Sequence, residues 1–155
     1  VRAQVPDARF WIVGMNPAPA VQALAGEGVV VTGTVPDVRP YLAHSDVIVA
    51  PLRIARGIQN KVLEAMAMAR PVVISSAPAT GLEARSGHDC EIAHSADEFV
   101  SRTVELLADV TLRRSMGQAA REAVLRSYSW SAHLAALEKL LGASTHCSVV
   151  AHGAQ

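Results

Sequence analysis

The sequence has 155 residues, of which 50% are hydrophobic and only 4% aromatic, and its formal net charge is zero. This length and apolar content suit one domain with a core built from aliphatic side chains. The neutral charge balance argues against a nucleic-acid-binding groove, and no apolar run approaches the roughly 20 residues that cross a bilayer.

Apolar runs that end at glycine or proline alternate with helical patterns along the chain. We expect strands at residues 9–14, 29–33, 46–52, 72–74 and 90–93. We expect helices at residues 21–25, at 38–44 with Asp37 as a cap, and from about residue 60 to a stop at Pro71. Further helices are predicted at residues 97–108, at 111–128 with Thr111 as N-cap, and at 130–141 before Gly142.

This alternation predicts an α/β fold, in which a parallel sheet carries helices on both faces. Ligands bind beyond the carboxyl ends of the strands in such sheets, so the candidate ligand loops are residues 14–19, 33–36, 51–61 and 75–83. Gly14 and Gly33 each end a strand at this edge. A glycine there either lets a ligand approach closely or forms an ordinary tight turn. Neither loop carries a dinucleotide-binding or P-loop fingerprint.

The segment before the fourth strand has the strongest binding signal. Gly57 precedes a helix whose first turn exposes backbone N–H groups, and Lys61 adds a positive charge to this anion-attracting end. Arg53 and Arg56 lie just before it, so the segment suits a diphosphate. The alternative is a solvated basic loop in which Lys61 pairs with Glu64.

Glu64 is a single charge between apolar neighbours in the same helix, and a carboxylate in such a place needs a partner or a ligand. An ionised carboxylate accepts two hydroxyl hydrogens well, so a ribose diol is a natural partner. The alternative is a structural glutamate that local groups satisfy. No nucleophile–base pair and no metal-ligand spacing is found, and we expect no metal and no cofactor. Cys90 and Cys147 have no pairing pattern and are expected to be free thiols in a reducing cytoplasm.

The stretch from Gly57 to Val73, GIQNKVLEAMAMARPVV, resembles the donor-binding motif of retaining GT-B glycosyltransferases of family 4, the glycosyl transferases group 1 class. The strand ends at Gly14 and Gly33, the run YLAHSDVIVAP at residues 41–51 and the C-terminal Tyr-Ser-Trp at 128–130 agree with it. The resemblance covers about residues 1–142. The Gln-Asn-Lys variant is most similar to sugar transferases associated with exosortase-type exopolysaccharide loci.

The resemblance implies the C-terminal half of a GT-B fold, Rossmann-like with a helical C-terminus. A donor-binding domain would span residues 1–142, incomplete at its N-terminus, and a flexible tail would span 143–155. Glu64 would hold the ribose hydroxyls. The diphosphate would lie against the catalytic Lys61 and the N–H groups around Val62 and Leu63. The other donor-site residues implied are Gly57, Ile58 and Asn60 in the same motif, Gly33 and Thr34 near the base, and Gly14 near the phosphates or the domain cleft.

Arg56 stands where relatives have a glutamate that contacts the donor sugar, so it would instead face the phosphates or the acceptor, or the loop would be arranged differently. The implied function is transfer of a sugar from a UDP- or GDP-sugar to a glycan or lipid acceptor. An acceptor domain and the first strand–helix unit of the donor domain would lie outside these residues. The 155-residue chain alone would then bind nucleotide weakly and transfer no sugar.

The implied location is the cytoplasm, with peripheral attachment to the inner face of the membrane through the acceptor domain as a further option. Two alternatives stay open. One is part of a GT-B nucleotide-sugar epimerase, which would need acid and base residues not found in these residues. The other is a non-catalytic nucleotide-sugar-binding subunit, which the arginine at position 56 favours.

Overall fold

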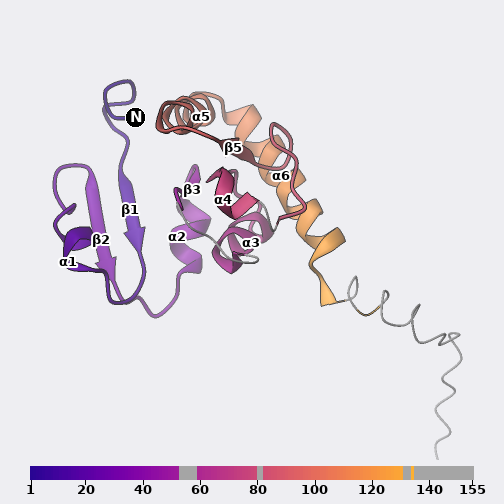
Figure 1. Cartoon of the computed structure of the whole chain (residues 1–155), viewed down its shortest axis with the longest axis horizontal. Coiled ribbons are helices and arrows are strands. Elements are labelled where there is room, and N and C mark those ends of the chain that lie inside the picture. The colour runs from indigo at the N-terminus through magenta and orange to yellow at the C-terminus, as the bar shows by residue number, and fades with distance from the viewer. Residues whose placement is uncertain (53–58, 80–81, 131–133, 135–155) are drawn as a thin grey trace, which may run out of the picture.

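The computed structural model of the protein describes residues 1–52, 59–79, 82–130 and 134 (Figure 1). Within these residues the strands are β1 (Phe10–Val13), β2 (Val29–Gly33), β3 (Ile48–Ala50), β4 (Val72–Ser75) and β5 (Glu91–Ala93). The helices are α1 (Pro19–Gln22), α2 (Arg39–His44), α3 (Asn60–Ala67), α4 (Ser76–Ala79), α5 (Ala96–Ala108) and α6 (Val110–Ser127). The predicted α/β order of elements is therefore confirmed.

The strands are parallel, as predicted, but they form two sheets instead of one. β1 pairs with β2, and β3, β4 and β5 form a second sheet in that order. Figure 1 shows β1 and β2 on one side of the molecule and the three-stranded sheet with most of the helices on the other. The expectation of a single sheet is corrected here: β1 and β3 do not pair with each other.

The core lies on both faces of the three-stranded sheet, and β4 forms its centre. Val72 and Ile74 pack with α3 and α6 on one face, whereas Val73 packs with α5 on the other, and all three side chains are fully buried. A β-branched, apolar strand is expected where helices cover both faces of a sheet. The sheet and its helical cover were therefore predicted correctly for this half of the chain.

Helix α3 ends before Pro71 and by a different mechanism from the predicted one. The last helical residue is Ala67, and Ala69 follows with a left-handed φ of 54°. The Ala69 N–H donates to Met66 O at 2.9 Å, and the Arg70 N–H donates to Ala65 O at 3.1 Å. These two bonds form a Schellman motif, which satisfies the last carbonyl groups of the helix.

Helix starts were predicted less accurately than helix positions. Asp109, not Thr111, caps α6, because its carboxylate accepts the N–H groups of Thr111 and Leu112 at 2.8 and 2.9 Å. Ser95 caps α5 by accepting the Glu98 N–H at 3.2 Å. The helical turn α4 lies inside a segment that was expected to be a loop. The predicted helix at 130–141 lies outside the described residues except for positions 130 and 134.

Helix α5 buries Thr103 and Leu106, whereas Val100 and Val104 are only half-buried. Hydrophobic side chains therefore lie on two sides of α5, and only one of these sides packs on the sheet. Among the described residues, no helix is long and apolar enough to cross a membrane.

Candidate nucleotide-binding site

Strands β1 to β4 each end in one of the loops expected at the ligand edge or in the turn α4. That a ligand binds at these strand ends stays a prediction. A hollow of about 470 Å³ lies at the carboxyl ends of β1 and β2. It is lined by residues from the loop after β1, from α1 and from the end of β2: Asn16, Pro17, Gln22, Ala25, Val31, Thr32, Gly33 and Thr34. A hollow of this size falls within the range of small-molecule sites.

Gly33 and Thr34 both line this hollow, so two of the predicted site residues come together here. Gly33 has a φ of 68°, a conformation that glycine adopts without strain and that turns the chain sharply at the end of β2. Ala25 and Val31 add apolar surface, and Asn16 and Thr34 are exposed polar groups at its edge. Such a lining suits a flat ring that carries hydrogen-bonding groups.

Sequence reasoning missed Asn16 and Gln22, which also line the hollow. The Gln22 side-chain amide donates to Pro17 O at 3.0 Å and so holds α1 against the loop after β1. Asn16 has a left-handed φ of 51°. The Asn-Pro pair after a strand-ending glycine was a usable turn signal, but nothing local indicated that α1 would fold back toward β2.

Gly14 does not line the hollow, although it ends β1 at the same edge. A Cβ atom placed on it would meet no atom within 4 Å, and its φ is not left-handed. The fold of the described residues therefore does not require glycine at this position. Its role near the phosphates stays a prediction.

Helix α3 presents its N-terminus at the carboxyl end of the three-stranded sheet. Asn60 and Lys61 occupy its first two positions with exposed side chains, and N–H groups at these positions have no acceptor within a helix. The Val62 and Leu63 N–H groups donate to Gln59 O at 2.9 and 3.2 Å. The backbone groups best placed for an anion are therefore those of Asn60 and Lys61, two residues earlier than expected.

Glu64 lies one turn into α3, and its side chain is exposed rather than enclosed by the apolar residues around it. Val62, Ala65 and Met66 of the same helix face the core, so Glu64 is on the opposite, solvent-facing side. No ion pair joins it to Lys61 among the contacts of the described residues. The described contacts therefore do not include the alternative predicted from the sequence, an ion pair between Lys61 and Glu64.

The remaining predicted residues of this motif, Arg56, Gly57 and Ile58, lie outside the described residues, as does Arg53. Two contacts nearby connect the loops at this edge. Ser75 Oγ donates to Leu52 O at 2.5 Å, and the Glu83 N–H donates to the Tyr128 hydroxyl at 2.6 Å. The ends of β3 and β4, and the end of α6, are thereby held to the same edge.

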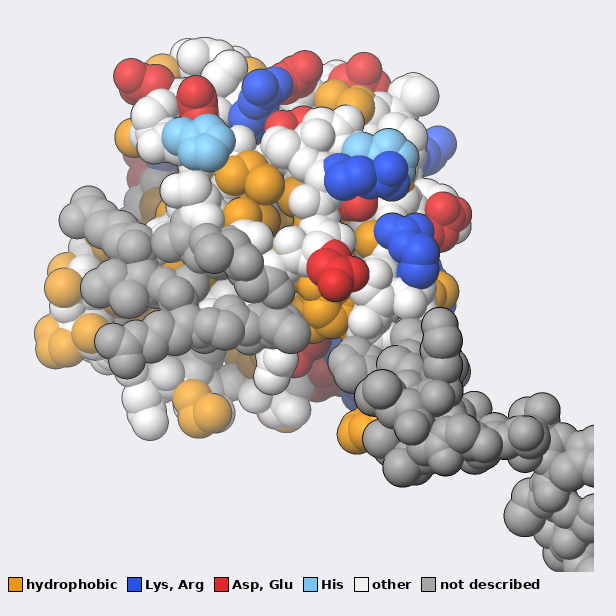
Figure 2. Space-filling view, turned by 45° about the vertical axis from the view of Figure 1, so that its right-hand side comes forward, with side chains coloured by type: hydrophobic (Ala, Val, Ile, Leu, Met, Phe, Trp, Pro, Cys, Tyr) orange, Lys and Arg blue, Asp and Glu red, His pale blue; other side chains and the backbone are white. Residues whose placement is uncertain are grey.

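The charges around these elements are mixed in sign. Figure 2 shows one face of the molecule, on which basic, acidic and apolar side chains alternate without a large basic field. Cys90 is a free thiol with no exposed surface, and burial raises its pKa to about 12, so it is not available as a nucleophile at neutral pH. Among the described residues, no group of three or more His, Cys, Asp and Glu side chains could hold a metal ion.

The described strand ends are thus accompanied by a hollow, by a helix N-terminus with an exposed lysine, and by an exposed carboxylate one turn further along that helix. Comparison with known proteins bears on this combination. Residues 1–109 match the family model described as "Glycosyl transferases group 1". No curated protein sequence matches the chain.

Several solved structures share the fold. Sucrose-phosphate synthase from Thermosynechococcus elongatus matches with a TM-score of 0.74 and 22% identity over 92% of this chain and 41% of that chain. HepE from Anabaena, solved with UDP and glucose, matches with a TM-score of 0.71 and 17% identity over 90% of this chain and 41% of that one.

The C-terminal domain of the group 1 glycosyl transferase LpcC from Francisella tularensis matches with a TM-score of 0.61 and 20% identity. That match covers 70% of this chain and 58% of the LpcC chain. The chain therefore spans about two fifths to three fifths of the solved proteins it matches here.

Proposed function

Because the chain belongs to the glycosyl transferases group 1 family, we propose that it is the donor-binding part of a retaining GT-B glycosyltransferase. The reaction moves a sugar from a UDP- or GDP-sugar to a glycan or lipid acceptor, and residues 1–142 form the donor-binding domain. The observation that carries the proposal is the placement of Lys61 and Glu64, both exposed, at the start of α3 on the ligand edge of the sheet.

Each part of the ligand edge binds one part of the nucleotide-sugar donor. The base lies in the hollow beside Gly33 and Thr34, where Ala25 and Val31 offer apolar contact. The diphosphate lies at the start of α3 and accepts from the N–H groups of Asn60 and Lys61 and from the Lys61 ammonium group. HepE was solved with UDP and with UDP-glucose, which supports a uridine nucleotide as the first donor to test.

Glu64 binds the ribose in this arrangement. A nucleoside diphosphate extends from base to phosphate through its ribose, and an exposed carboxylate one turn from the phosphate-binding end is placed to accept from both hydroxyl groups. An unpaired carboxylate keeps this capacity free, and the structure leaves Glu64 without an ion pair to Lys61.

Catalysis in this proposal is electrostatic. Cleavage of the bond between sugar and diphosphate places negative charge on the leaving nucleoside diphosphate, and Lys61 with the helix N-terminus stabilises that charge. For Arg56, which lies outside the described residues, we propose contact with the phosphates or the acceptor rather than with the sugar. The acceptor site lies on another domain, and the 155-residue chain alone binds nucleotide weakly and transfers no sugar. An exopolysaccharide acceptor at the inner face of the membrane fits the exosortase-associated motif.

Calorimetry with UDP-, GDP- and ADP-glucose tests the proposal. We expect one nucleotide to bind and Glu64→Ala to lose about ten- to a hundredfold in affinity, since a hydrogen bond to a charged group contributes about 1.5–3 kcal/mol. Glu122→Ala is the matched control, because Glu122 is also an exposed glutamate within a helix but lies on α6. Full affinity in Glu64→Ala would remove the ribose role, and no binding of any nucleotide would refute the donor site.

Analysis of the reaction product separates the proposed enzyme from the two alternatives. A transferase forms a new glycosidic bond, an epimerase returns a nucleotide-sugar with one inverted carbon, and a binding subunit leaves the donor unchanged.

A further inference from the structure

Gln22 is held at both ends beside the hollow at the carboxyl ends of β1 and β2. Its backbone N–H donates to Ala18 O at 3.0 Å, and its side-chain amide donates to Pro17 O, also at 3.0 Å. Gln22 and Pro17 both line the hollow. The side chain is therefore fixed at the wall of the hollow, although it is exposed to solvent.

The bond to Pro17 also determines which atom of the Gln22 amide remains for a ligand. A backbone carbonyl oxygen only accepts hydrogen bonds, so the atom of the amide that faces Pro17 O is the nitrogen Nε2. The carbonyl oxygen Oε1 is bonded to the same carbon atom and points away from Pro17 O. Gln22 thus keeps a hydrogen-bond acceptor of fixed direction at the hollow.

The other polar side chains of the lining differ in what they can offer. The Thr32 hydroxyl donates to Gly33 O at 3.0 Å, so its hydrogen is directed to the backbone and not to a ligand. Asn16 and Thr34 are the remaining polar side chains of the lining, and both are exposed. An amide and a hydroxyl group both donate hydrogen bonds. The lining therefore combines the fixed acceptor of Gln22 with two side chains that can donate.

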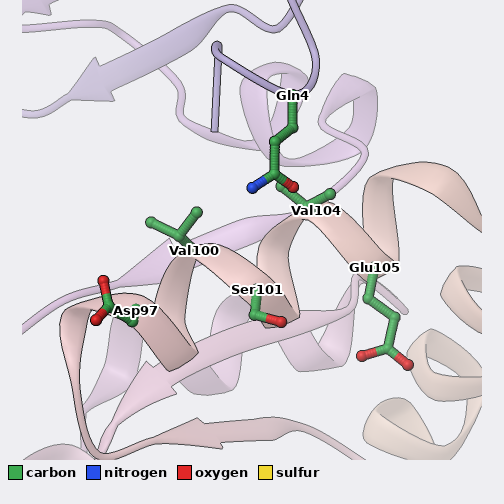
Figure 3. A pocket seen from close by; sticks show the side chains of 6 residues that line it. All are labelled: Gln4, Asp97, Val100, Ser101, Val104 and Glu105. Atoms are coloured by element: carbon green, nitrogen blue, oxygen red, sulfur yellow. The ribbon is translucent and has the colours of Figure 1, made fainter.

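The hollow beside Gln22 is uncharged. None of the described residues that line it carries a charged side chain, whereas the hollow between Gln4 and α5 includes the carboxylates of Asp97 and Glu105 (Figure 3). An uncharged lining accepts a nucleotide without repelling its phosphates. It also discriminates between bases, because guanine presents two adjacent N–H donors that match the two oxygens of a carboxylate. The lining supplies no such partner for guanine.

Uracil matches the polar groups that are present. Its hydrogen-bonding edge has one N–H group at ring position N3, between two carbonyl oxygens. Gln22 Oε1 suits this N–H, and the donors of Asn16 and Thr34 suit the two carbonyl oxygens. Cytosine and adenine carry a ring nitrogen without hydrogen at the corresponding position, so each would direct a lone pair at Gln22 Oε1.

We propose that Gln22 selects a uridine nucleotide by accepting a hydrogen bond from the N3–H group of the base. Gln22 is then a specificity-determining residue, and its bond to Pro17 O fixes the orientation on which the selection depends. The inference rests on the proposed function, because it assigns the base of the nucleotide-sugar donor. Nucleotides of guanine, cytosine and adenine are the disfavoured ligands.

Matched nucleotides test the contact from the side of the ligand. UDP and N3-methyl-UDP differ only at the N3 position, where a methyl group replaces the hydrogen that Gln22 accepts. CDP has the same ribose and diphosphate but lacks this hydrogen. NMR titration of residues 1–155 measures the dissociation constants. We expect UDP to bind about tenfold more tightly than N3-methyl-UDP or CDP, because one hydrogen bond is lost and an acceptor is left unpaired. GDP and ADP should also bind more weakly than UDP.

A variant tests the contact from the side of the protein. Gln22→Met keeps the length of the side chain and removes its acceptor, so the ratio of UDP affinity to CDP affinity should fall toward one. A purely structural role of the bond to Pro17 would weaken both nucleotides by the same factor and leave this ratio unchanged.

Gln118→Met is the matched control for Gln22→Met. Gln118 is also an exposed helical glutamine, and its amide also donates one hydrogen bond at 3.0 Å, to Glu122 Oε1 on α6. Because Gln118 does not line the hollow, Gln118→Met should keep the affinity ratio of the natural protein.

Failure of this inference is distinguishable from failure of the proposed function. Equal affinity of the natural protein for UDP and N3-methyl-UDP would overturn the role of Gln22 and leave the donor site intact, and so would an unchanged affinity ratio in Gln22→Met. Tighter binding of GDP than of UDP would show that the hollow selects another base. No binding of any nucleotide would overturn both the inference and the donor site.

Discussion

Ala69 holds a backbone conformation that glycine adopts at lower cost. Its φ of 54° places it in the left-handed region at the end of α3, where the Schellman bonds of Ala69 and Arg70 fix it. An L-residue with a Cβ atom loses roughly 1–2 kcal/mol there. The end of α3 is therefore a site at which the natural residue is not the most stable one.

We expect Ala69→Gly to raise the free energy of unfolding by about 0.5–1 kcal/mol, because relief of the left-handed strain exceeds the extra entropy that glycine gives the unfolded chain. Ala67→Gly, two residues earlier in ordinary helical conformation, is the control and should lower it by about 1 kcal/mol. Urea unfolding of the two variants checks both signs. A less stable Ala69→Gly protein would show that the left-handed alanine carries no strain.

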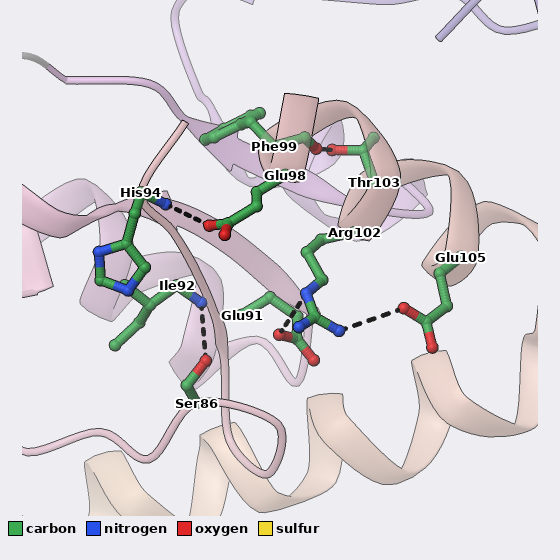
Figure 4. A network of polar contacts seen from close by, with 9 residues as sticks. All are labelled: Ser86, Glu91, Ile92, His94, Glu98, Phe99, Arg102, Thr103 and Glu105. Atoms are coloured by element: carbon green, nitrogen blue, oxygen red, sulfur yellow. Dashed lines mark hydrogen bonds and ion pairs between the residues drawn. The ribbon is translucent and has the colours of Figure 1, made fainter. Parts of the chain in front are cut away.

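Glu91 is a carboxylate in an unfavourable place. Its side chain is 8% exposed, its Oε2 atom accepts no hydrogen bond, and the Arg102 guanidinium nitrogen Nε lies 3.6 Å from that oxygen (Figure 4). Burial raises the pKa of the Glu91 carboxyl above its usual value, although Arg102 partly opposes this effect. The raised pKa means that the protonated form of Glu91 is favoured more in the folded protein than in the unfolded chain.

A raised folded-state pKa gives stability that is present below the unfolded pKa of about 4.3 and is lost as pH rises through the folded value. Glu91→Gln does not titrate, so its stability relative to the natural protein should improve as pH increases from about 4 to about 7. Glu122→Gln, on the exposed side of α6, is the control and should show a smaller trend. Urea unfolding across this pH range checks the prediction. A relative stability of Glu91→Gln that falls with pH would contradict it.

At the scale of elements, α3 and α6 cross closely because α6 carries a glycine at the contact. A Cβ atom on Gly117 would lie 2.9 Å from the carbonyl carbon of Ala69 and closer still to its oxygen. Gly117 is buried within α6, between Met116 and Ala120, which are also buried. The absence of a side chain thus lets the end of α3 lie directly on the α6 backbone.

Gly117→Ala should destabilise the protein by about 1–3 kcal/mol, because the helices must move apart to admit the methyl group. Alanine favours an isolated helix by about 1 kcal/mol over glycine, so helix propensity alone would stabilise the variant. A loss of stability would therefore show that the packing cost is larger than the gain in helix propensity. Gly26→Ala is the matched control, since its Cβ would meet no atom within 4 Å. Thermal unfolding of the two variants provides the measurement. A stabilised Gly117→Ala protein would indicate that α6 can shift without loss of packing.

For the whole molecule, the two sheets differ in burial, and their stability should differ in the same direction. The β1–β2 sheet contains no buried residue, whereas Val72, Val73 and Ile74 of β4, at the centre of the other sheet, are fully buried. Local opening requires less free energy where few apolar contacts are lost. We expect ladder amides of β2 to exchange at least about tenfold faster than those of β4 in native-state hydrogen exchange of residues 1–155. Equal rates would mean that the sheets open only together.

Much of this organisation could be predicted from local patterns. β-branched runs that end at Gly33 or follow Pro71 located their strands, and the strand-end rule pointed to the hollow that Gly33 and Thr34 line. Non-local choices could not be predicted. Local patterns did not indicate that β1 and β3 would remain unpaired with each other, and Gln22 reaches the hollow only because α1 folds back toward β2.

Ambiguous signals explain the remaining differences. Helix α5 has apolar residues on two sides, so periodicity could not decide whether Val104 or Leu106 would face the core. An alanine at the end of α3 gave no sign of a left-handed cap, and Pro71 therefore seemed to be the helix stop. Glu64 was identified from its apolar sequence neighbours, but in the fold these point inward while it points outward.

The fluorescence of Trp11 offers a way to follow the exposure of β1. Trp11 is one of two tryptophans in the sequence, and the centroid of its ring lies 5.9 Å from that of Tyr41 on α2. The other, Trp130, is 85% exposed and supplies a steady background. A ring that is 45% exposed emits as a partly hydrated fluorophore and shifts to shorter wavelength when water is displaced from it. The tryptophan emission of the protein therefore reports whether water reaches the exposed surface of β1.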